Sequence, residues 1–278
     1  MTTDGNPKLN ALELMTGAVQ HLWSLRNAHA MLAFVVMLPY ALMGVLGFLD
    51  PFYVMARTGE PVDGATGSIL LLILWGVFWN TPALVLWYRL FLVGSDDIIA
   101  VPAPVFMERA LRLIGYSIMF GLLVLGIAVI AIMVLSLVMS ATGRPPEAGV
   151  GQGPMAMALI VIALALGGRL CLTFASITLG PTQPFRQAWE RTRGNGFAIA
   201  AALLLCVFLG GVASALVHAL ATALLIGPIE GSIPSRLFLI DLVLAPISYA
   251  STALVCAVTA GVFWRLNGQP GTVVNLDA

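Results

Sequence analysis

Long apolar runs separated by short polar segments dominate this chain. Six of them are long enough to cross a bilayer as helices: 29–49, 68–90, 113–139, 155–177, 197–226 and 238–264. A helix needs about 20 apolar residues to span a hydrocarbon core of about 30 Å. The pattern therefore predicts an all-α polytopic membrane protein with six transmembrane helices. Pro39, Pro82 and Pro246 interrupt three runs, which membrane helices tolerate where neighbouring helices satisfy the freed carbonyl groups.

The runs divide the chain into three parts. Residues 1–28 are expected to form a cytoplasmic N-terminus with an interfacial amphipathic helix. Residues 29–266 form the six-helix transmembrane domain, and residues 267–278 a cytoplasmic C-terminal tail. No secretory signal is visible, so the first run is expected to be a retained span.

Composition agrees with the pattern and excludes other classes. Apolar residues make up 60% of the chain and charged residues 9%, against about 25% charged in soluble domains. This excludes a soluble globule and a disordered chain. A net charge of zero without a basic domain also excludes a nucleic-acid binder. The three cysteines lie in apolar runs and are expected to be small buried hydrophobes.

The basic residues predict the orientation. With six spans, the side that holds both termini carries ten of them: Lys8, Arg26, Arg89, Arg109, Arg112, Arg169, Arg186, Arg191, Arg193 and Arg265. The other side carries three: Arg57, Arg144 and Arg236. By the positive-inside rule, both termini are expected in the cytoplasm and the protein in the bacterial cytoplasmic (inner) membrane.

An internal repeat follows the same residues. An Arg-Leu pair recurs near the end of each even-numbered run, at Arg89, Arg169 and Arg265. A short amphipathic basic segment precedes each odd-numbered run, at 13–26, 106–112 and 185–193. We expect three units, each an interfacial amphipathic helix followed by a transmembrane hairpin.

Arginines at this interface are candidates for binding lipid phosphates, because the guanidinium fork matches phosphate oxygens. The candidates are Arg26, Arg89, Arg112, Arg169, Arg193 and Arg265. The alternative is that they only signal topology, as arginines do in any inner-membrane protein.

Two segments resemble a known group of proteins. Arg169-Leu170 is followed by residues 185–195, which read FRQAWERTRGN, and residues 87–94 read WYRLFLVG. These resemble the motifs of uncharacterised bacterial six-helix inner-membrane proteins. That group is similar to the membrane domain N-terminal to some glycerophosphoryl diester phosphodiesterases. The phosphodiesterase barrel with its metal-binding acids has no counterpart here, so the resemblance implies the six-helix fold and not the hydrolysis.

A few polar residues inside the runs are candidates for an intramembrane site, since such groups are functional candidates by default. They are Asn80 and Thr81 in the second run, Ser214, His218 and Thr222 in the fifth, and Asp241 and Thr252 in the sixth. Asn80-Thr81-Pro82 is a possible helix break that exposes carbonyls, as in transporters. Asp241 has two potential partners, Arg236 and His218. A packing histidine, a capping aspartate and a simple proline kink are the alternatives.

Other residues in these segments are assigned structural or solvent-exposed roles. Gly211, Ala215, Ala219 and Ala223 form a small-residue stripe on the fifth run that suits close helix packing. His21 and His29 flank the first interfacial segment and are expected to be solvated.

No catalytic, metal-binding or cofactor motif occurs. An enzyme acting on lipids needs clustered acids near an interface, and only Asp96, Asp97 and Glu108 come close. We therefore expect a non-catalytic scaffold, assembly factor or accessory subunit of a membrane complex. A transporter or lipid-handling protein that uses a polar face on helices 2, 5 and 6 is the alternative. Membrane lipids and other membrane protein subunits are the expected partners, without nucleic acid.

Overall fold

The computed structural model describes residues 7–98, 100–141, 152–180, 185–226 and 233–267, in which helices are joined by turns and no strand occurs. The helices are α1 (Ala11–Ser24), α2 (Arg26–Val45), α3 (Asp50–Thr58), α4 (Ala65–Trp75), α5 (Thr81–Val93), α6 (Ala103–Ala141), α7 (Gln152–Leu179), α8 (Phe185–Arg191), α9 (Gly196–Leu225), α10 (Ser235–Val243), α11 (Ala245–Ser248) and α12 (Ala250–Asn267). A single π-helical stretch, η1 (Gly76–Asn80), joins α4 to α5.

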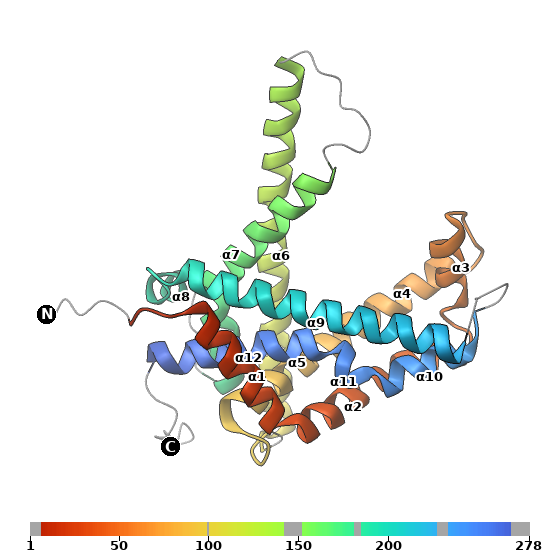
Figure 1. Cartoon of the computed structure of the whole chain (residues 1–278), viewed down its shortest axis with the longest axis horizontal. Helices are drawn as coiled ribbons and strands as arrows, with labels where there is room; N and C mark the ends of the chain where they lie inside the picture. Colours follow the sequence, from red (N-terminus) through yellow and green to blue (C-terminus); the bar gives the residue numbers. More distant parts are fainter. Residues whose placement is uncertain (1–6, 99, 142–151, 181–184, 227–232, 268–278) are drawn as a thin grey trace, which may run out of the picture.

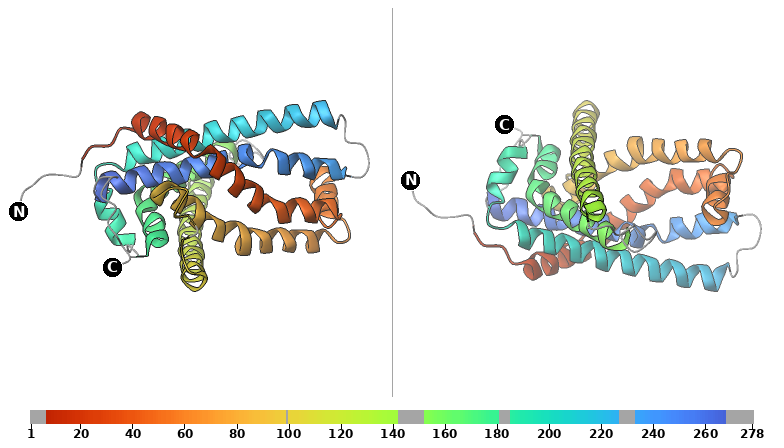
Figure 2. Two further views of the ribbon diagram at one scale, coloured as in Figure 1. Left: turned by 90° about the horizontal axis from the view of Figure 1, so that it is seen from below. Right: turned by 90° about the horizontal axis from the view of Figure 1, so that it is seen from above.

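Most of the long helices extend in one general direction, and one pair does not. Helix α9 packs along α12, and α10 packs along α2. Helix α1 lies across α12 and α9. The hairpin of α6 and α7 rises away from these helices and is seen almost end-on in Figure 2, where α9 and α4 run across the view (Figure 1, Figure 2). The described helices are therefore not a parallel bundle.

Each of the six predicted apolar runs is mostly helical, although the first extends four residues past the end of α2 at Val45. The described part of the chain has four apolar helical stretches of membrane-spanning length. These are Arg26–Val45, Ala65–Val93, Ala103–Ile127 and Gly196–Leu225. Ala165–Leu179 of α7 is a shorter apolar helix. The sixth run is divided among α10, α11 and α12. The structure thus supports a helical membrane protein, and the count of six spans stays a prediction.

The expected repeat is only partly visible. Helices α1 and α8 are separate short helices before α2 and α9, as the basic segments predicted. Residues 106–112, the second predicted interfacial segment, instead continue without a break into α6. The three units differ at this point, so their equivalence is not established.

The buried core lies where α5, α7, α9 and α12 meet, near α1. Trp87, Leu172, Ile199 and Val258 are fully buried there. A Cβ on Gly168 would lie 3.0 Å from the backbone nitrogen of Ala200, so glycine allows α7 and α9 to cross closely.

The small-residue stripe on α9 was assigned to the wrong face. Gly211, Ala215, Ala219 and Ala223 are exposed, and no atom lies within 4 Å of a Cβ built on Gly211. The close contact is instead at Gly210, where a Cβ would lie 2.8 Å from Cα of Ser251 in α12. Helix α9 buries the face that carries Ile199 and Cys206, because α12 and α7 pack on that side.

Two tryptophans satisfy backbone carbonyls beside Pro39. Proline lacks the N–H that would bond to the carbonyl four residues earlier, which is that of Val35. The Trp79 indole donates to the Val35 carbonyl at 3.4 Å, and the Trp75 indole to the Val36 carbonyl at 3.2 Å. This confirms that a neighbouring helix supplies the missing donor at Pro39.

Removal of the Trp79 donor will reveal this compensation. Trp79→Phe is expected to lower the free energy of unfolding by about 1 kcal/mol, a typical net value for one hydrogen bond. The loss will be smaller in a Pro39→Ala background, where alanine restores a backbone donor for the Val35 carbonyl. A double-mutant cycle measured by denaturant unfolding in bicelles checks this. Equal losses in both backgrounds would contradict it.

Candidate functional site

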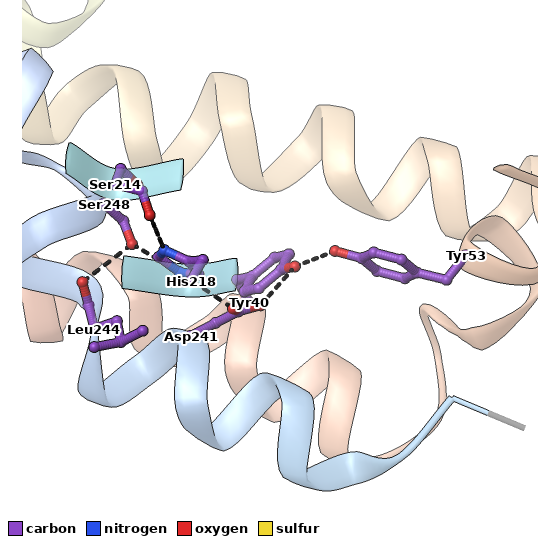
Figure 3. A network of polar contacts seen from close by, with 7 residues as sticks. All are labelled: Tyr40, Tyr53, Ser214, His218, Asp241, Leu244 and Ser248. Carbon is purple, nitrogen blue, oxygen red and sulfur yellow. Dashed lines mark hydrogen bonds and ion pairs between the residues drawn. The ribbon is translucent and has the colours of Figure 1, made fainter. Parts of the chain in front are cut away.

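Six polar side chains from five helices form the most extensive polar contact network inside the described apolar helices. The polar cluster consists of Tyr40, Tyr53, Ser214, His218, Asp241 and Ser248. They come from α2, α3, α9, α10 and α11 and point toward one another (Figure 3). An unpaired polar group in apolar surroundings costs several kcal/mol, so each member stabilises the position of the others.

His218 and Asp241 form the centre of the polar cluster. His218 Nε2 lies 3.4 Å from Asp241 Oδ1, which selects His218 over Arg236 as the partner of Asp241. On the other side of the ring, Nδ1 lies 2.9 Å from the carbonyl oxygen of Ser214. A carbonyl oxygen only accepts, so Nδ1 carries a hydrogen and donates to it.

The interaction between the two facing atoms depends on where hydrogens lie. With a hydrogen on Nδ1, a neutral His218 has a lone pair on Nε2. An ionised Asp241 also presents a lone pair at Oδ1, and two lone pairs facing each other repel. A proton on Nε2 or on Oδ1 makes the contact a hydrogen bond, and without it Nε2 can accept from the Ser248 hydroxyl, 3.3 Å away. The geometry is therefore compatible with a proton shared between His218 and Asp241.

Two tyrosines extend the polar cluster from Asp241 toward α3. The Tyr40 hydroxyl donates to Asp241 Oδ2 at 3.4 Å. The Tyr53 hydroxyl contacts the Tyr40 hydroxyl, and since Tyr40 donates to Asp241, Tyr53 donates to Tyr40. The hydroxyls form a directed chain that ends at the carboxylate (Figure 3).

Ser248 connects the polar cluster to an interrupted helix. Its hydroxyl lies 3.3 Å from His218 Nε2 and 3.1 Å from the carbonyl oxygen of Leu244. Helix α11 is a single turn that carries Ser248, and it is separated from α10 and α12 at Leu244 and Tyr249. Pro246 contributes to the interruption, because it has no N–H for the regular helical hydrogen bond.

His29 contacts the same interrupted turn from the other side. His29 Nε2 lies 2.9 Å from the carbonyl oxygen of Pro246, and the Trp87 indole donates to His29 Nδ1 at 3.1 Å. Because an indole N–H only donates, Nδ1 accepts and His29 is neutral with its hydrogen on Nε2. The expectation that His29 is solvated was wrong, since only 5% of it is exposed; α11 and α5 cover the first turns of α2.

The predicted intramembrane residues separate into two groups. Ser214, His218 and Asp241 meet in the polar cluster, whereas Thr222 and Thr252 have no side-chain hydrogen bond to it among the described contacts. Sequence reasoning missed Tyr40, although a tyrosine hydroxyl within an apolar run next to a proline was an available signal. Tyr53 lies outside the six predicted runs, between the first and the second.

Asn80 and Thr81 lie apart from the polar cluster, and of the two alternatives at this position the helix break is absent. The backbone widens into η1 and continues as α5. The Thr81 hydroxyl and its backbone N–H both donate to the Gly76 carbonyl, so this carbonyl is not exposed. Asn80 Oδ1 is buried without a partner among the described residues. The helix interruption lies instead in the sixth predicted run, which is divided among α10, α11 and α12.

The arginines proposed to bind phosphates differ in what they contact. Arg89 is buried, and its guanidinium donates to the carbonyl oxygens of Asp97, Ile98 and Thr178. This corrects the prediction for Arg89, because these carbonyls enclose the group away from the lipid headgroups. Together with Arg109, which also donates to Thr178, Arg89 caps the C-terminal end of α7, where carbonyl oxygens lack helical partners.

The other phosphate candidates are more accessible. Arg112 pairs with Glu108 four residues earlier, and Arg265 lies 3.4 Å from Glu13 of α1. The Arg26 side chain lies over Trp23, and Arg169 lies 4.1 Å from the centre of the Trp189 ring. Arg193 is exposed. Binding of lipid phosphate by these five residues stays a prediction.

Within the described residues, no three histidine, cysteine, aspartate or glutamate side chains are grouped closely enough to hold a metal ion. Comparison of the chain with protein-family models, with curated proteins and with solved structures gives no match. The site is therefore interpreted from its own geometry.

The structural role of His29 is testable against a matched histidine. His29→Phe is expected to lower the free energy of unfolding by about 2–3 kcal/mol, because it leaves a buried indole and a carbonyl without partners. His21→Phe is the control, since His21 is exposed and its edge contact with Phe91 survives with another ring. Unfolding in bicelles measures both, and equal effects would contradict the assignment.

Proposed function

We propose that this chain is a multi-pass protein of the bacterial cytoplasmic membrane that transports a solute, with the His218–Asp241 pair as its proton-binding site. The observation that carries the proposal is the geometry of that pair. Its two facing atoms are 3.4 Å apart, and Nδ1 is directed to the Ser214 carbonyl, so one proton fits between Nε2 and Oδ1. Ionisable pairs inside membrane helices are the usual components of proton relays.

The interrupted helix supports transport over a static role. Broken helices place backbone carbonyls and hinges beside the binding sites of many transporters. Here α11 is held by His218 through Ser248 and by His29 through Pro246. Removal of the proton from the pair changes the partners available to Ser248, so protonation and the position of α11 are coupled.

We propose that α2, α4 with α5, α9, and α10 with α12, which extend in one general direction, cross the membrane. The six crossings predicted from the sequence add α6 and α7, whose hairpin points away from these helices in the structure. We propose that both ends are cytoplasmic, as the arginine distribution predicts. The contact of Arg265 with Glu13 supports one common side for the two ends. His218 then lies seven residues before the outer end of α9, or roughly 10 Å at 1.5 Å per residue.

The remaining predictions are ranked on the same geometry. A non-catalytic scaffold or accessory subunit is our second proposal, because a scaffold does not need a proton-sharing pair between its helices. Membrane lipids are proposed as partners of the exposed arginines. We also propose that the chain is related to the six-helix inner-membrane proteins that it resembles, and that its three units form a repeat.

Proton binding is testable without knowledge of the solute. Protein in vesicles on a solid-supported membrane is exposed to pH jumps, and the charge displaced is recorded. We expect a transient displacement that Asp241→Asn reduces at least tenfold, because the amide does not exchange the proton. A transported solute, sought among amino acids, sugars and carboxylates, will convert the transient current into a sustained one.

Thr222→Val and Thr252→Val are matched controls, because these residues were expected at the site and have no hydrogen bond to the polar cluster. Both are expected to retain the wild-type displacement. No displacement in the wild type, or an equal one in Asp241→Asn, would overturn the proposal.

A further inference from the structure

Two arginines from distant segments are brought together at the start of α9, at the end of this helix that is away from the polar cluster. Arg169 is held there by three contacts. Its guanidinium stacks 4.1 Å from the centre of the Trp189 ring and donates to the Trp189 carbonyl at 3.0 Å. Gly196 gives it room, because a Cβ there would lie 2.5 Å from Arg169 Cδ. Arg193 lies close enough for its charge to act on Arg169, so two like charges are neighbours.

Asn195 brings a third positive charge to the same place. Its side-chain oxygen accepts from the Leu9 N–H at 2.8 Å, and its side-chain nitrogen donates to the Pro7 carbonyl at 2.9 Å. These two bonds fix the backbone on both sides of Lys8 beside the start of α9, where the N-terminal segment and α8 meet this helix (Figure 1). Asn195 is also the N-cap residue of α9, and its side chain makes no capping bond.

No acidic side chain in the described segments neutralises these three charges. None of the four ion pairs there includes Lys8, Arg169 or Arg193. Glu190, the acid nearest to Arg193 in the sequence, pairs with Arg186 at 3.0 Å. The first turn of α9 carries no acidic residue either, although the positive end of the helix dipole lies there.

This arrangement is unfavourable unless an anion completes it. Like charges repel, and the dipole of α9 adds to the repulsion. Arg169 also retains unused donors: Nε is buried without a partner in the described part of the chain, and a guanidinium has five N–H groups. Guanidinium groups match the oxygens of phosphate in geometry and charge.

We propose that Arg169 and Arg193, with Lys8, bind the phosphomonoester headgroup of a membrane lipid. A phosphomonoester carries about −1.5 to −2 charge near neutral pH, and a phosphodiester about −1, so the monoester matches a site of several positive charges better. The affinity comes from the headgroup charge and not from transfer of the acyl chains, which stay in the bilayer.

Two exposed aromatic side chains favour a lipid over a free phosphate ion. Trp189 is 44% exposed and Phe197, in the first turn of α9, is 90% exposed. Aromatic rings beside arginines are typical of the headgroup level of a membrane. The inference rests on the proposed lipid partnership of the exposed arginines, and it is independent of proton transport.

The test is native mass spectrometry of the full chain in detergent micelles, titrated with phosphatidic acid, phosphatidylglycerol or phosphatidylcholine. We expect phosphatidic acid to bind about tenfold more tightly than phosphatidylglycerol. Arg193→Gln is expected to weaken phosphatidic acid binding about tenfold, the usual effect of one hydrogen bond to a charged group. Because Arg193 is exposed, this variant keeps the fold, and Arg169→Gln is expected to act in the same direction.

Arg186→Gln is the matched control, because Arg186 is an exposed arginine of α8 that pairs with Glu190. It is expected to retain the wild-type affinity, and an equal loss in this variant would overturn the inference as diffuse attraction. Equal affinity for phosphatidic acid and phosphatidylglycerol would overturn the choice of headgroup. Displacement of the lipid by an equal concentration of inorganic phosphate would identify a soluble anion as the ligand instead.

The outcomes also separate this site from the proposed function. A preference for anionic lipids that persists in Arg193→Gln overturns the site and leaves the lipid partnership of the other arginines intact. Equal binding of all three lipids contradicts both. Loss of proton displacement with retained phosphatidic acid binding contradicts only the proposed transport.

Discussion

The structure depends on one constraint: a polar group among apolar helices must find its partner within the protein. In a hydrocarbon surrounding no water replaces a missing hydrogen bond. The polar cluster, the His29–Trp87 pair and the arginines that cap α7 are all solutions to this constraint. Each joins helices that are distant in sequence. Apolar packing alone discriminates weakly between alternative helix neighbours, so these few polar contacts favour the neighbours observed.

The same constraint explains how the α11 turn is held in place. Pro246 and the interruptions at Leu244 and Tyr249 leave this turn with fewer backbone bonds than a continuous helix. Two histidines supply side-chain contacts in their place, and they differ in chemistry. His29 is fixed as a neutral ring by the Trp87 donor, whereas His218 faces the Asp241 carboxyl group. In the proposed function, the His29 contact stays constant and the His218 contact responds to protonation.

The apolar pattern predicted the helices because run length and hydropathy are local properties, and all six runs are largely helical. It also identified Ser214, His218 and Asp241, since ionisable groups inside such runs are conspicuous. It did not identify the roles of Tyr40 or the buried His29. Their hydrogen-bond partners Tyr53 and Pro246 lie 13 and 217 residues away along the chain, on other helices. The packing face of α9 was misassigned for the same reason. Small residues permit close approach of a second helix, but the position of that helix determines which small residues it contacts. A helix break at Pro82 was one of two alternatives, beside a simple proline kink, whereas the interrupted helix lies at Pro246. The two prolines look alike in sequence.

The central claim is that protonation of the His218–Asp241 pair controls the α11 turn. Hydrogen–deuterium exchange of residues 244–249, measured in lipid nanodiscs and corrected for the intrinsic effect of pH, tests it most directly. The account predicts that protection of this turn falls as the shared proton is lost at high pH, and that Asp241→Asn abolishes the pH response while the protection of α9 persists. Protection of residues 244–249 that stays constant with pH in the wild type, or that responds equally in Asp241→Asn, would contradict the claim.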